Sequence, residues 1–383
     1  MTVPESVESA VAGGPNPFVY AHPVGPEDLI DRAAELGELC ELVEGGHFAR
    51  LTAPRRYGKT TLLSRVRADC ERLLGRTAID VDFSRVLSLG DVAIRVEDAY
   101  RRATDGPVKG LVRQIMRSWN LGVALGAGGL AARLEANPKV DPLPALHRLL
   151  DLPRDVFSRS GERFVVTFDE FHEVLKLDGV DGILRSHVQH HGEFAGYVFA
   201  GSEPGMMETL FARRERPLFG QAHPVALGPL SDADLGAFIA ERFRASGRDA
   251  GEALDALLEF ADGHPQRAMM LAHYLWRETP HGGAASVSTW SEALDAAIAP
   301  RAEGFDRFLD TLSTTEERVL FALALSPTGP YSTYAQQRFG LPRSSAADAL
   351  RSLAGRGEVV TVDGTPRITD PLLRWWLRQR RAP

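Results

Sequence analysis

The segment from Leu51 to Thr61 constrains the fold more than any other part of the sequence. It follows a short apolar run and contains Ala-x-x-x-x-Gly-Lys-Thr-Thr, and the residues after it have apolar side chains at helical spacing. A strand, a tight loop and a helix in this order are typical of a phosphate-binding loop, whose backbone N–H groups surround phosphate oxygens. The sequence therefore predicts a nucleotide-binding loop.

Residues of this loop have distinct expected roles. Lys59 supplies a point charge for the β- and γ-phosphates, and the Thr60 hydroxyl is placed for Mg²⁺. Gly58 allows a close approach of the backbone to the phosphates. The alternative is a basic turn before a surface helix. The loop residues expected at the nucleotide are Ala53, Pro54, Arg55, Arg56, Tyr57, Gly58, Lys59, Thr60 and Thr61.

A second segment, Arg163 to Phe171, is an apolar run that ends in Asp169 and Glu170. Such a run is typical of a central parallel strand, and ligands bind outside the carboxyl ends of these strands. We expect Asp169 to hold Mg²⁺ through water and Glu170 to polarise the water that attacks the γ-phosphate. An ordinary strand with a polar turn is the alternative, but two such motifs in this order favour a catalytic site.

Ser202 follows another short strand, from Gly196 to Gly201. If this strand neighbours the one that ends in Asp169, the hydroxyl could contact the γ-phosphate or the attacking water. The same serine also suits the N-cap of the next helix. The sequence is compatible with both roles for Ser202.

Composition narrows the class of protein. A chain of 383 residues is expected to form two or three domains. The net charge of −7 argues against a surface that binds nucleic acid throughout. No apolar run reaches the roughly 18 to 20 residues of a membrane span, and the N-terminal residues do not resemble a secretory signal. We therefore expect a cytoplasmic protein in which Cys40 and Cys70 are buried free thiols.

The chain divides into four expected parts. Residues 1–25 are predicted to form a flexible tail. Residues 26–230 alternate strands with helices, which predicts an α/β domain with a parallel sheet. Residues 231–300 predict a helical lid, and residues 301–383 a winged helix. Arg32 is placed near the expected nucleotide entrance.

In the expected lid, the stretch Gly263 to Pro265 separates two helical segments. Arg267 follows this break and is a candidate to reach the phosphates. A solvated surface arginine is the alternative for this position.

The expected winged helix has a hairpin that turns at Asp363 and Gly364. Residues 313–383 contain ten Arg against six Asp plus Glu, a local charge of +4 that suits contacts with DNA phosphates. The third helix of this part offers only Arg351 and Arg356 as long basic groups. A contact module for a protein partner is therefore the alternative.

Together these segments resemble the prokaryotic archaeal-type ATPase family, in the STAND and AAA+ branch related to origin-recognition ATPases. The resemblance implies an ATP-dependent switch, with Ser202 at the sensor position and Pro265 in the lid motif. His172 is a departure, since many relatives carry Gln there. The matching segments are residues 16–18, 31–32, 54–60, 168–171, 199–202, 216–220, 263–265 and 370–376.

Three other groups of residues are candidate sites. A cluster of three histidines is expected to form a polar helix face, because a metal site would need further ligands: His187, His190 and His191. The arginines between Arg213 and Arg216 suit either an arginine finger or an exposed basic run. Trp375 and Trp376 are expected to anchor the last helix.

The sequence thus predicts an α/β P-loop NTPase of the AAA+/STAND type with a helical lid and a C-terminal winged helix. It is expected to bind Mg²⁺ and ATP, to hydrolyse ATP slowly, and to couple this cycle to double-stranded DNA or a protein partner. A homo-oligomer is compatible with this prediction. The alternatives are a nucleotide-gated signalling protein with incidental hydrolysis and no DNA contact, and a nucleotide-dependent DNA-loading protein.

Overall fold

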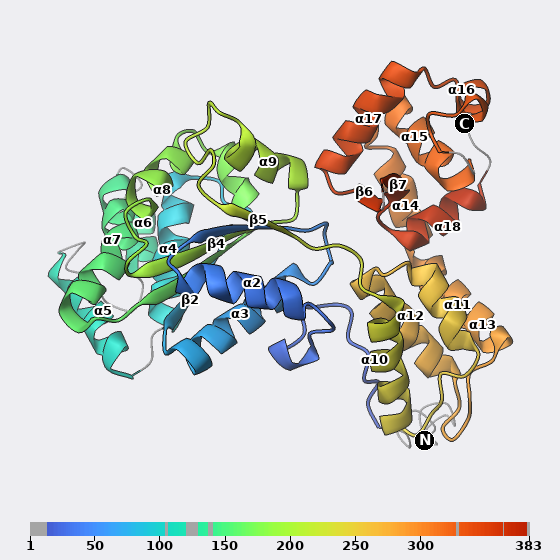
Figure 1. The fold of residues 1–383 in the computed structure, drawn as a ribbon, viewed down its shortest axis with the longest axis horizontal. Coiled ribbons are helices and arrows are strands. Elements are labelled where there is room, and N and C mark those ends of the chain that lie inside the picture. Colours follow the sequence, from blue (N-terminus) through green and yellow to red (C-terminus); the bar gives the residue numbers. More distant parts are fainter. Residues whose placement is uncertain are drawn as a thin grey trace.

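The computed structural model describes residues 14–103, 106–119, 129–136, 141–326, 329–362 and 364–380, and Figure 1 shows their arrangement. Within these ranges the chain forms a five-stranded parallel sheet, a two-stranded hairpin and many helices. The sheet and its helices make one part of the molecule, and the lid and winged helix make two further helical groups beside it. The α/β fold with a helical lid and a winged helix is thus confirmed.

The large sheet has the strand order β2-β3-β4-β1-β5, and all its paired neighbours are parallel. Every residue of β3 and β4 is buried, which explains their nearly continuous apolar sequences. Because β1, β3 and β4 are neighbouring parallel strands, their carboxyl ends lie along the same edge of the sheet, which we call its carboxyl edge. The strands are β1 (Phe48–Thr52), β2 (Thr77–Asp82), β3 (Phe164–Asp169), β4 (Ala195–Gly201) and β5 (His223–Ala226).

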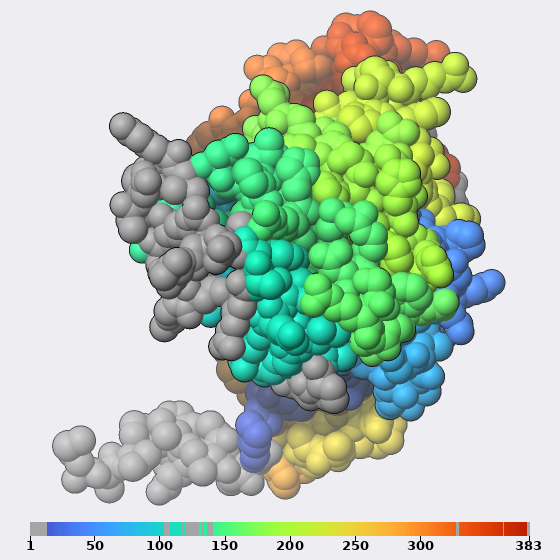
Figure 2. All heavy atoms as spheres, turned by 90° about the vertical axis from the view of Figure 1, so that its left-hand side faces the viewer, coloured from blue at the N-terminus to red at the C-terminus, as the bar shows by residue number. Residues whose placement is uncertain are grey.

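Helices cover both faces of this sheet. Leu39 and Val43 of α2 (Ala33–Glu44) pack with α3 (Lys59–Leu74) on one face, and a larger apolar cluster fills the other face. Figure 2 shows the molecule from the second side, with the winged helix above and the lid below. The other helices of this part are η1 (Pro26–Asp28), α4 (Leu89–Ala103), α5 (Gly106–Ser118), α6 (Gly129–Ala136), α7 (Leu143–Ser160), η2 (Phe171–Lys176), α8 (Val180–Val188) and α9 (Pro204–Ala212).

The lid begins at Ser231, whose hydroxyl accepts a hydrogen bond from the backbone of Asp234 and so caps α10. Its apolar side chains are continuous with those of the winged helix in a single cluster. The lid helices are α10 (Asp232–Ala245), α11 (Ala253–Ala261), α12 (Pro265–Glu278) and α13 (Val287–Ile298). A connection formed by η3 (Ala299–Arg301) and α14 (Ala302–Leu309) leads to the winged helix.

The winged helix consists of three helices, a hairpin and a last helix. A capping box between Ser313 and Glu316 starts its first helix. Trp376 is buried and contacts Phe305 at 5.5 Å between ring centroids. Asp363, at the expected turn, lies outside the described residues. The elements are α15 (Thr314–Leu325), α16 (Thr333–Phe339), α17 (Arg343–Gly355), β6 (Val359–Val362), β7 (Thr365–Ile368) and α18 (Pro371–Arg378).

The expectation of a flexible tail over residues 1–25 is wrong for its second half. Phe18 is buried and lies 5.3 Å from Phe243 of the lid between ring centroids. The Asn16 side chain donates a hydrogen bond to the backbone oxygen of His273 at 3.0 Å. An aromatic contact and hydrogen bonds together therefore attach this polar, Pro-containing segment to the lid. Residues 1–13 lie outside the described part.

Candidate nucleotide-binding site

Residues from three separate segments meet at the carboxyl edge of the sheet. Lys59 is the first residue of α3, Asp169 ends β3, and Ser202 follows β4. The loop between β1 and α3 contains two left-handed residues, Arg56 with φ 69° and Gly58 with φ 84°. A Cβ on Gly58 would meet no atom within 4 Å, so its left-handed backbone is what favours glycine there.

Lys59 is held by both acids of the second motif. Its Nζ forms an ion pair with Asp169 Oδ1 and lies 2.9 Å from Glu170 Oε1. Burial of Lys59 acts to lower its pKa, but Asp169 and Glu170 outweigh burial and the pKa is raised. The ammonium group therefore stays charged, next to the place where the phosphates are expected.

Thr60 and Asp169 offer two oxygen atoms for a cation. Thr60 Oγ1 donates a hydrogen bond to Asp169 Oδ2 at 3.0 Å. Hydroxyl and carboxylate oxygens suit Mg²⁺, which is usually bound by one or two protein groups together with substrate phosphates and water. Among the residues that the structure describes, no group of three or more His, Cys, Asp or Glu side chains could hold a metal ion without further ligands.

Glu170 lies in the middle of a short chain of hydrogen bonds. Ser202 Oγ donates to Glu170 Oε2 at 2.7 Å, and the Glu170 backbone N–H donates to Asp169 Oδ1 at 2.8 Å. Burial raises the pKa of Glu170, but Lys59 and Ser202 lower it further, so the carboxyl group remains ionised. The N-cap of α9 is Glu203, so the Ser202 hydroxyl is directed at the site and does not cap that helix.

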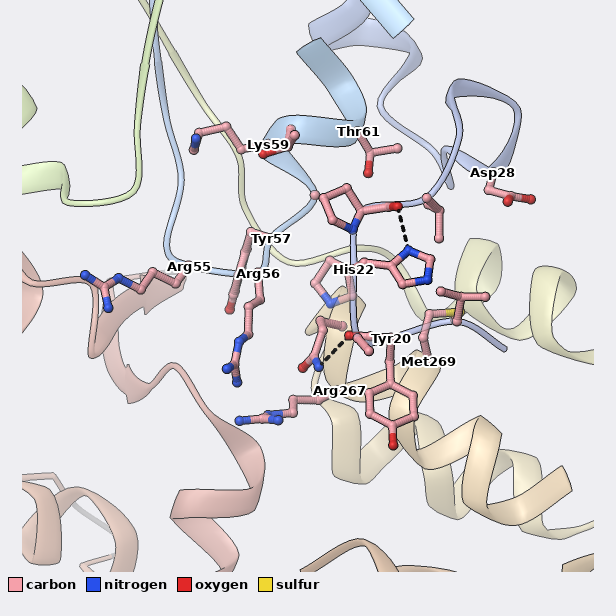
Figure 3. Close-up of a pocket in the computed structure, with 18 of the residues that line it drawn as sticks. Tyr20, His22, Asp28, Arg55, Arg56, Tyr57, Lys59, Thr61, Arg267 and Met269 are labelled. Atoms are coloured by element: carbon pink, nitrogen blue, oxygen red, sulfur yellow. Dashed lines mark hydrogen bonds between the residues drawn. The ribbon is translucent and has the colours of Figure 1, made fainter. Parts of the chain in front are cut away.

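A cavity of about 730 Å³ lies in front of these groups, between the core and the lid. Figure 3 shows the loop residues Arg55 to Lys59 on one side and the lid residues Arg267 and Met269 on the other. The volume suits a nucleotide. Apolar lining residues away from Lys59 are Val19, Val24, Leu29, Ile30, Leu230, Phe238 and Met269.

Most predicted site residues line this cavity, including Arg32, Pro265, Glu170, Ser202 and all of the loop from Pro54 to Thr61. The exceptions are Ala53 and Asp169. Ala53 is fully buried beneath the loop, and Asp169 lies behind Lys59.

Arg32 and Arg267 have partners that the sequence did not reveal. Arg32 is buried, and it donates to the backbone oxygen of Gly228 at 2.5 Å. Arg267 is only 5 % exposed and forms a bidentate ion pair with Asp370 of the winged helix. The alternative of a solvated surface arginine is therefore wrong for Arg267, which borders the cavity and the winged helix at once.

The N-terminal segment lines the cavity, which the sequence did not predict. Residues Tyr20 to Val24 line the cavity, and Gln266 of the lid donates a hydrogen bond to the Tyr20 backbone oxygen at 3.0 Å. The conspicuous Asn16-Pro17-Phe18 sequence was the available signal. Its composition is typical of a linker and gives no indication of a contact with the lid.

The remaining candidates occupy other places. Among the histidines expected on a polar helix face, His191 is buried and its Nδ1 lies 2.7 Å from the Tyr197 hydroxyl, so that expectation is wrong. His187 lies 2.8 Å from Asp151. Arg216 pairs with Asp181 at 2.9 Å, which removes it from the exposed basic run.

The cysteines are only partly as expected. Both thiols are free, and Cys70 is buried, but Cys40 is partly exposed.

Comparison with known proteins gives the class of the fold. No protein-family model and no curated protein matches the chain. Among solved structures, it is similar to a Walker-type ATPase of Pyrococcus abyssi, with a TM-score of 0.68, 20 % identity, and coverage of 94 % of this chain and 99 % of that one. It is also similar to the ORC2 protein of Aeropyrum pernix in its ADPNP–ADP complexes, with a TM-score of 0.59, 16 % identity, and coverage of 95 % and 97 %.

The chain therefore has the fold of a P-loop ATPase of the AAA+ class. The similarity extends over nearly the whole chain in both comparisons. At these identities the likeness concerns the fold. None of the helices in the described ranges is long and apolar enough to cross a bilayer.

Proposed function

We propose that this protein is an ATP-binding and ATP-hydrolysing switch. The observation that carries the proposal is the convergence of Lys59, Thr60 and Glu170 on one cavity large enough for a nucleotide, with Asp169 directly behind Lys59 and Thr60. These residues come from two segments more than 100 positions apart in the sequence. A structural ion pair alone does not account for the left-handed loop and the adjoining cavity.

Each residue has a definable task in this proposal. Lys59 binds the β- and γ-phosphates and exchanges its acidic partners for them. Glu170 accepts a proton from the water that attacks the γ-phosphorus, while the bond to the β–γ bridging oxygen breaks and ADP leaves. Ser202 orients Glu170. Thr60 and Asp169 would hold Mg²⁺, which neutralises phosphate charge when bound.

The output is proposed to pass through the winged helix. A Cβ on Gly357 would lie 3.4 Å from the Ser202 backbone oxygen and 3.5 Å from Pro54 Cα, so this turn lies directly against the site. The loop also contacts the lid, since the Tyr57 ring lies 4.8 Å from that of His264. We divide the chain into a core (26–230), a lid (231–300) and a winged helix (301–383), with residues 14–25 as part of the site.

Double-stranded DNA is the proposed partner of the winged helix. The exposed side of α16 and the start of α17 offers Tyr331, Tyr334, Arg338 and Arg343, and residues 318–347 contain no acid. Phosphate contacts and aromatic contacts suit such a surface.

A regulatory protein without DNA contact is the second candidate. It is favoured by the pairing of Arg351 with Asp348 and of Arg356 with Glu316, which neutralises two basic groups in the second half and at the end of the third helix.

The proposal is tested by measuring nucleotide binding and hydrolysis together. Lys59→Ala is expected to abolish ATP binding, because the charge for the phosphates is lost. Glu170→Gln is expected to retain binding and lose most hydrolysis, because the proton acceptor is removed. Normal hydrolysis by Glu170→Gln would contradict the catalytic assignment. Stimulation of hydrolysis by duplex DNA would favour the DNA partner, and no binding would favour the regulatory candidate.

A further inference from the structure

The two cysteines of the chain belong to different helices but lie at the same level of the fold. Cys40 is on α2 and Cys70 is on α3, and these helices pack together on one face of the sheet (Figure 1). Because α2 leads into β1 and α3 into β2, and all strands are parallel, both helices end at the edge opposite the carboxyl edge. Each cysteine lies four residues before the last residue of its helix, Glu44 or Leu74, so the topology brings the two side chains together.

Contacts at the ends of the two helices hold them beside each other. Arg76, just after α3, donates to the backbone oxygens of Val43 at 3.0 Å and of Glu44 at 2.8 Å, at the end of α2. The Cys70 thiol is hydrogen-bonded to the Cys40 sulfur. Two cysteines whose side chains already meet can be bridged without a large movement of the backbone.

The two thiols differ in exposure and in acidity. Cys40 is partly exposed, whereas Cys70 is fully buried. The hydrogen bond from Cys70 lowers the pKa of Cys40, and Arg65 acts in the same direction, although burial opposes both. The same hydrogen bond, together with burial, raises the pKa of Cys70. An exposed cysteine with a lowered pKa beside a second thiol is the arrangement found in cysteines that respond to oxidants.

We infer that Cys40 and Cys70 form a reversible disulfide when the protein meets hydrogen peroxide, and that this bond ties α3 to α2. The Cys40 thiolate attacks one peroxide oxygen, so an S–O bond forms, the O–O bond breaks, and Cys40 becomes a sulfenic acid. The Cys70 sulfur then attacks the Cys40 sulfur, the S–S bond forms, and the oxygen leaves with the Cys70 proton as water. The peroxide takes up the two electrons that the thiols lose, and a dithiol reductant reverses the reaction by exchange.

The disulfide would enclose the phosphate loop within a closed segment of chain. Residues 41–69 contain β1 and the whole loop from Ala53 to Lys59. A crosslink of this kind stabilises the fold mainly by restricting the unfolded chain. The part of α3 from Lys59 to Cys70 spans about 16 Å, and neither cysteine lines the cavity, so the bond leaves the nucleotide site open. It is therefore expected to form whether or not the protein hydrolyses ATP.

The alternative role for both cysteines is packing. Cys70 belongs to the apolar cluster on this face of the sheet, and Cys40 packs against that cluster. A buried thiol serves as a small apolar side chain in many proteins. Packing alone does not respond to peroxide, so oxidation separates the two roles.

A count of free thiols gives a direct test because the chain has only two cysteines. The full-length protein is reduced, desalted and exposed to hydrogen peroxide, and its thiols are then counted with dithionitrobenzoate after unfolding. We expect the count to fall from two to zero, with the protein still monomeric on a non-reducing gel. Dithiothreitol should restore both thiols. Mass spectrometry of tryptic peptides should find the peptides of Cys40 and Cys70 joined.

Cys40→Ser and Cys70→Ala are the matched control variants. Peroxide should raise the denaturant concentration at the midpoint of unfolding of the wild type and leave the midpoints of both variants unchanged. Cys40→Ser should also keep its remaining thiol, because Cys70 is buried. A wild type that keeps one or two thiols, that forms disulfide-linked dimers, or whose midpoint does not rise would overturn the inference. If Cys70→Ala does not fold, Cys40→Ser decides alone: loss of its thiol as fast as in the wild type would show that Cys40 is not the attacking group.

Discussion

Two clusters of paired charges in this molecule have opposite designs. The phosphate-loop cluster consists of Lys59, Asp169 and Glu170, and it faces the cavity. The junction cluster consists of Asp262, Arg267 and Asp370 with Arg367 and Arg374, and it joins the lid to the winged helix. In the first, a phosphate can replace the acids beside Lys59. In the second, each charge is matched by a protein partner.

The junction cluster is reciprocal. Lid residue Asp262 accepts from Arg367 at 3.0 Å and from Arg374 at 2.6 Å, both in the winged helix. Lid residue Arg267 donates in return to Asp370, with Nε 3.0 Å from Oδ1. The comparison teaches that an ion pair within one domain beside a cavity can exchange its partner for a ligand, whereas ion pairs between two domains attach them to each other. Arg267 belongs to both settings, since it also lines the cavity.

The largest expected effect comes from breaking the junction pair with Asp370→Ala. Burial raises the pKa of Asp370, but Arg267 lowers it further, so the carboxyl group is ionised and holds a buried guanidinium. Its loss should lower the free energy of unfolding by about 3–5 kcal/mol, measured by denaturant titration. The exposed Asp348, paired with Arg351, is the control, and Asp348→Ala should cost at most about 1 kcal/mol. Equal losses would remove the distinction between buried and exposed pairs.

The sequence revealed the first cluster and not the second, for a physical reason. Lys59 and Asp169 belong to local motifs whose strand ends must meet once the parallel sheet forms. Arg267 and Asp370 are 103 residues apart and meet only because the lid and winged helix share one apolar cluster. The same limit explains Phe18, whose docking on Phe243 has no local pattern. Motifs and periodicity therefore predicted the fold class and the end of the sheet at which Lys59 and Asp169 meet, while contacts between the lid and the winged helix needed the structure.

A smaller effect concerns the loss of stability at acid pH. It compares a histidine of the lid with a histidine of the core. Burial lowers the pKa of His264, near the junction cluster, to about 4, and burial also lowers that of His191, in the core, to about 4. Each ring is neutral in the folded protein near neutral pH. In the unfolded chain the histidine pKa is about 6.5, so below this pH unfolding takes up a proton. The stability they provide is therefore present above pH 6.5 and is lost as the pH falls toward 4.

His264→Asn tests the contribution of the junction. The His264 side chain caps α12 by accepting from the Arg267 backbone, and Asn can keep that bond without titrating in this range. Between pH 7 and pH 4 the variant should lose less unfolding free energy than the wild type, by up to about 3 kcal/mol. Denaturant titration across pH measures this, with the exposed His190→Asn as the control. Identical pH profiles for the wild type and His264→Asn would show that groups other than His264 cause the loss of stability at acid pH.

The smallest expected effect tests whether the winged helix is held by shape as well as charge. The start of α9 lies against the end of α17 (Figure 1), and a Cβ on Gly205 would be 2.7 Å from Gly355 Cα. Gly205→Ala should therefore cost about 1–3 kcal/mol through overpacking. A Cβ on Gly355 would lie 3.8 Å from Gly205 Cα, an ordinary contact, so Gly355→Ala is the matched control and should be neutral or slightly stabilising.

The asymmetry of these two glycines makes the test decisive. Both substitutions add one methyl group at the same interface, so propensity and size are nearly equal and only the direction of the Cβ differs. Because α9 begins two residues after Ser202, Gly205→Ala should also change the rate of ATP hydrolysis, while Gly355→Ala should not. If both variants unfold at the same denaturant concentration, the contact between α9 and α17 contributes little, and the junction cluster alone holds the winged helix in place.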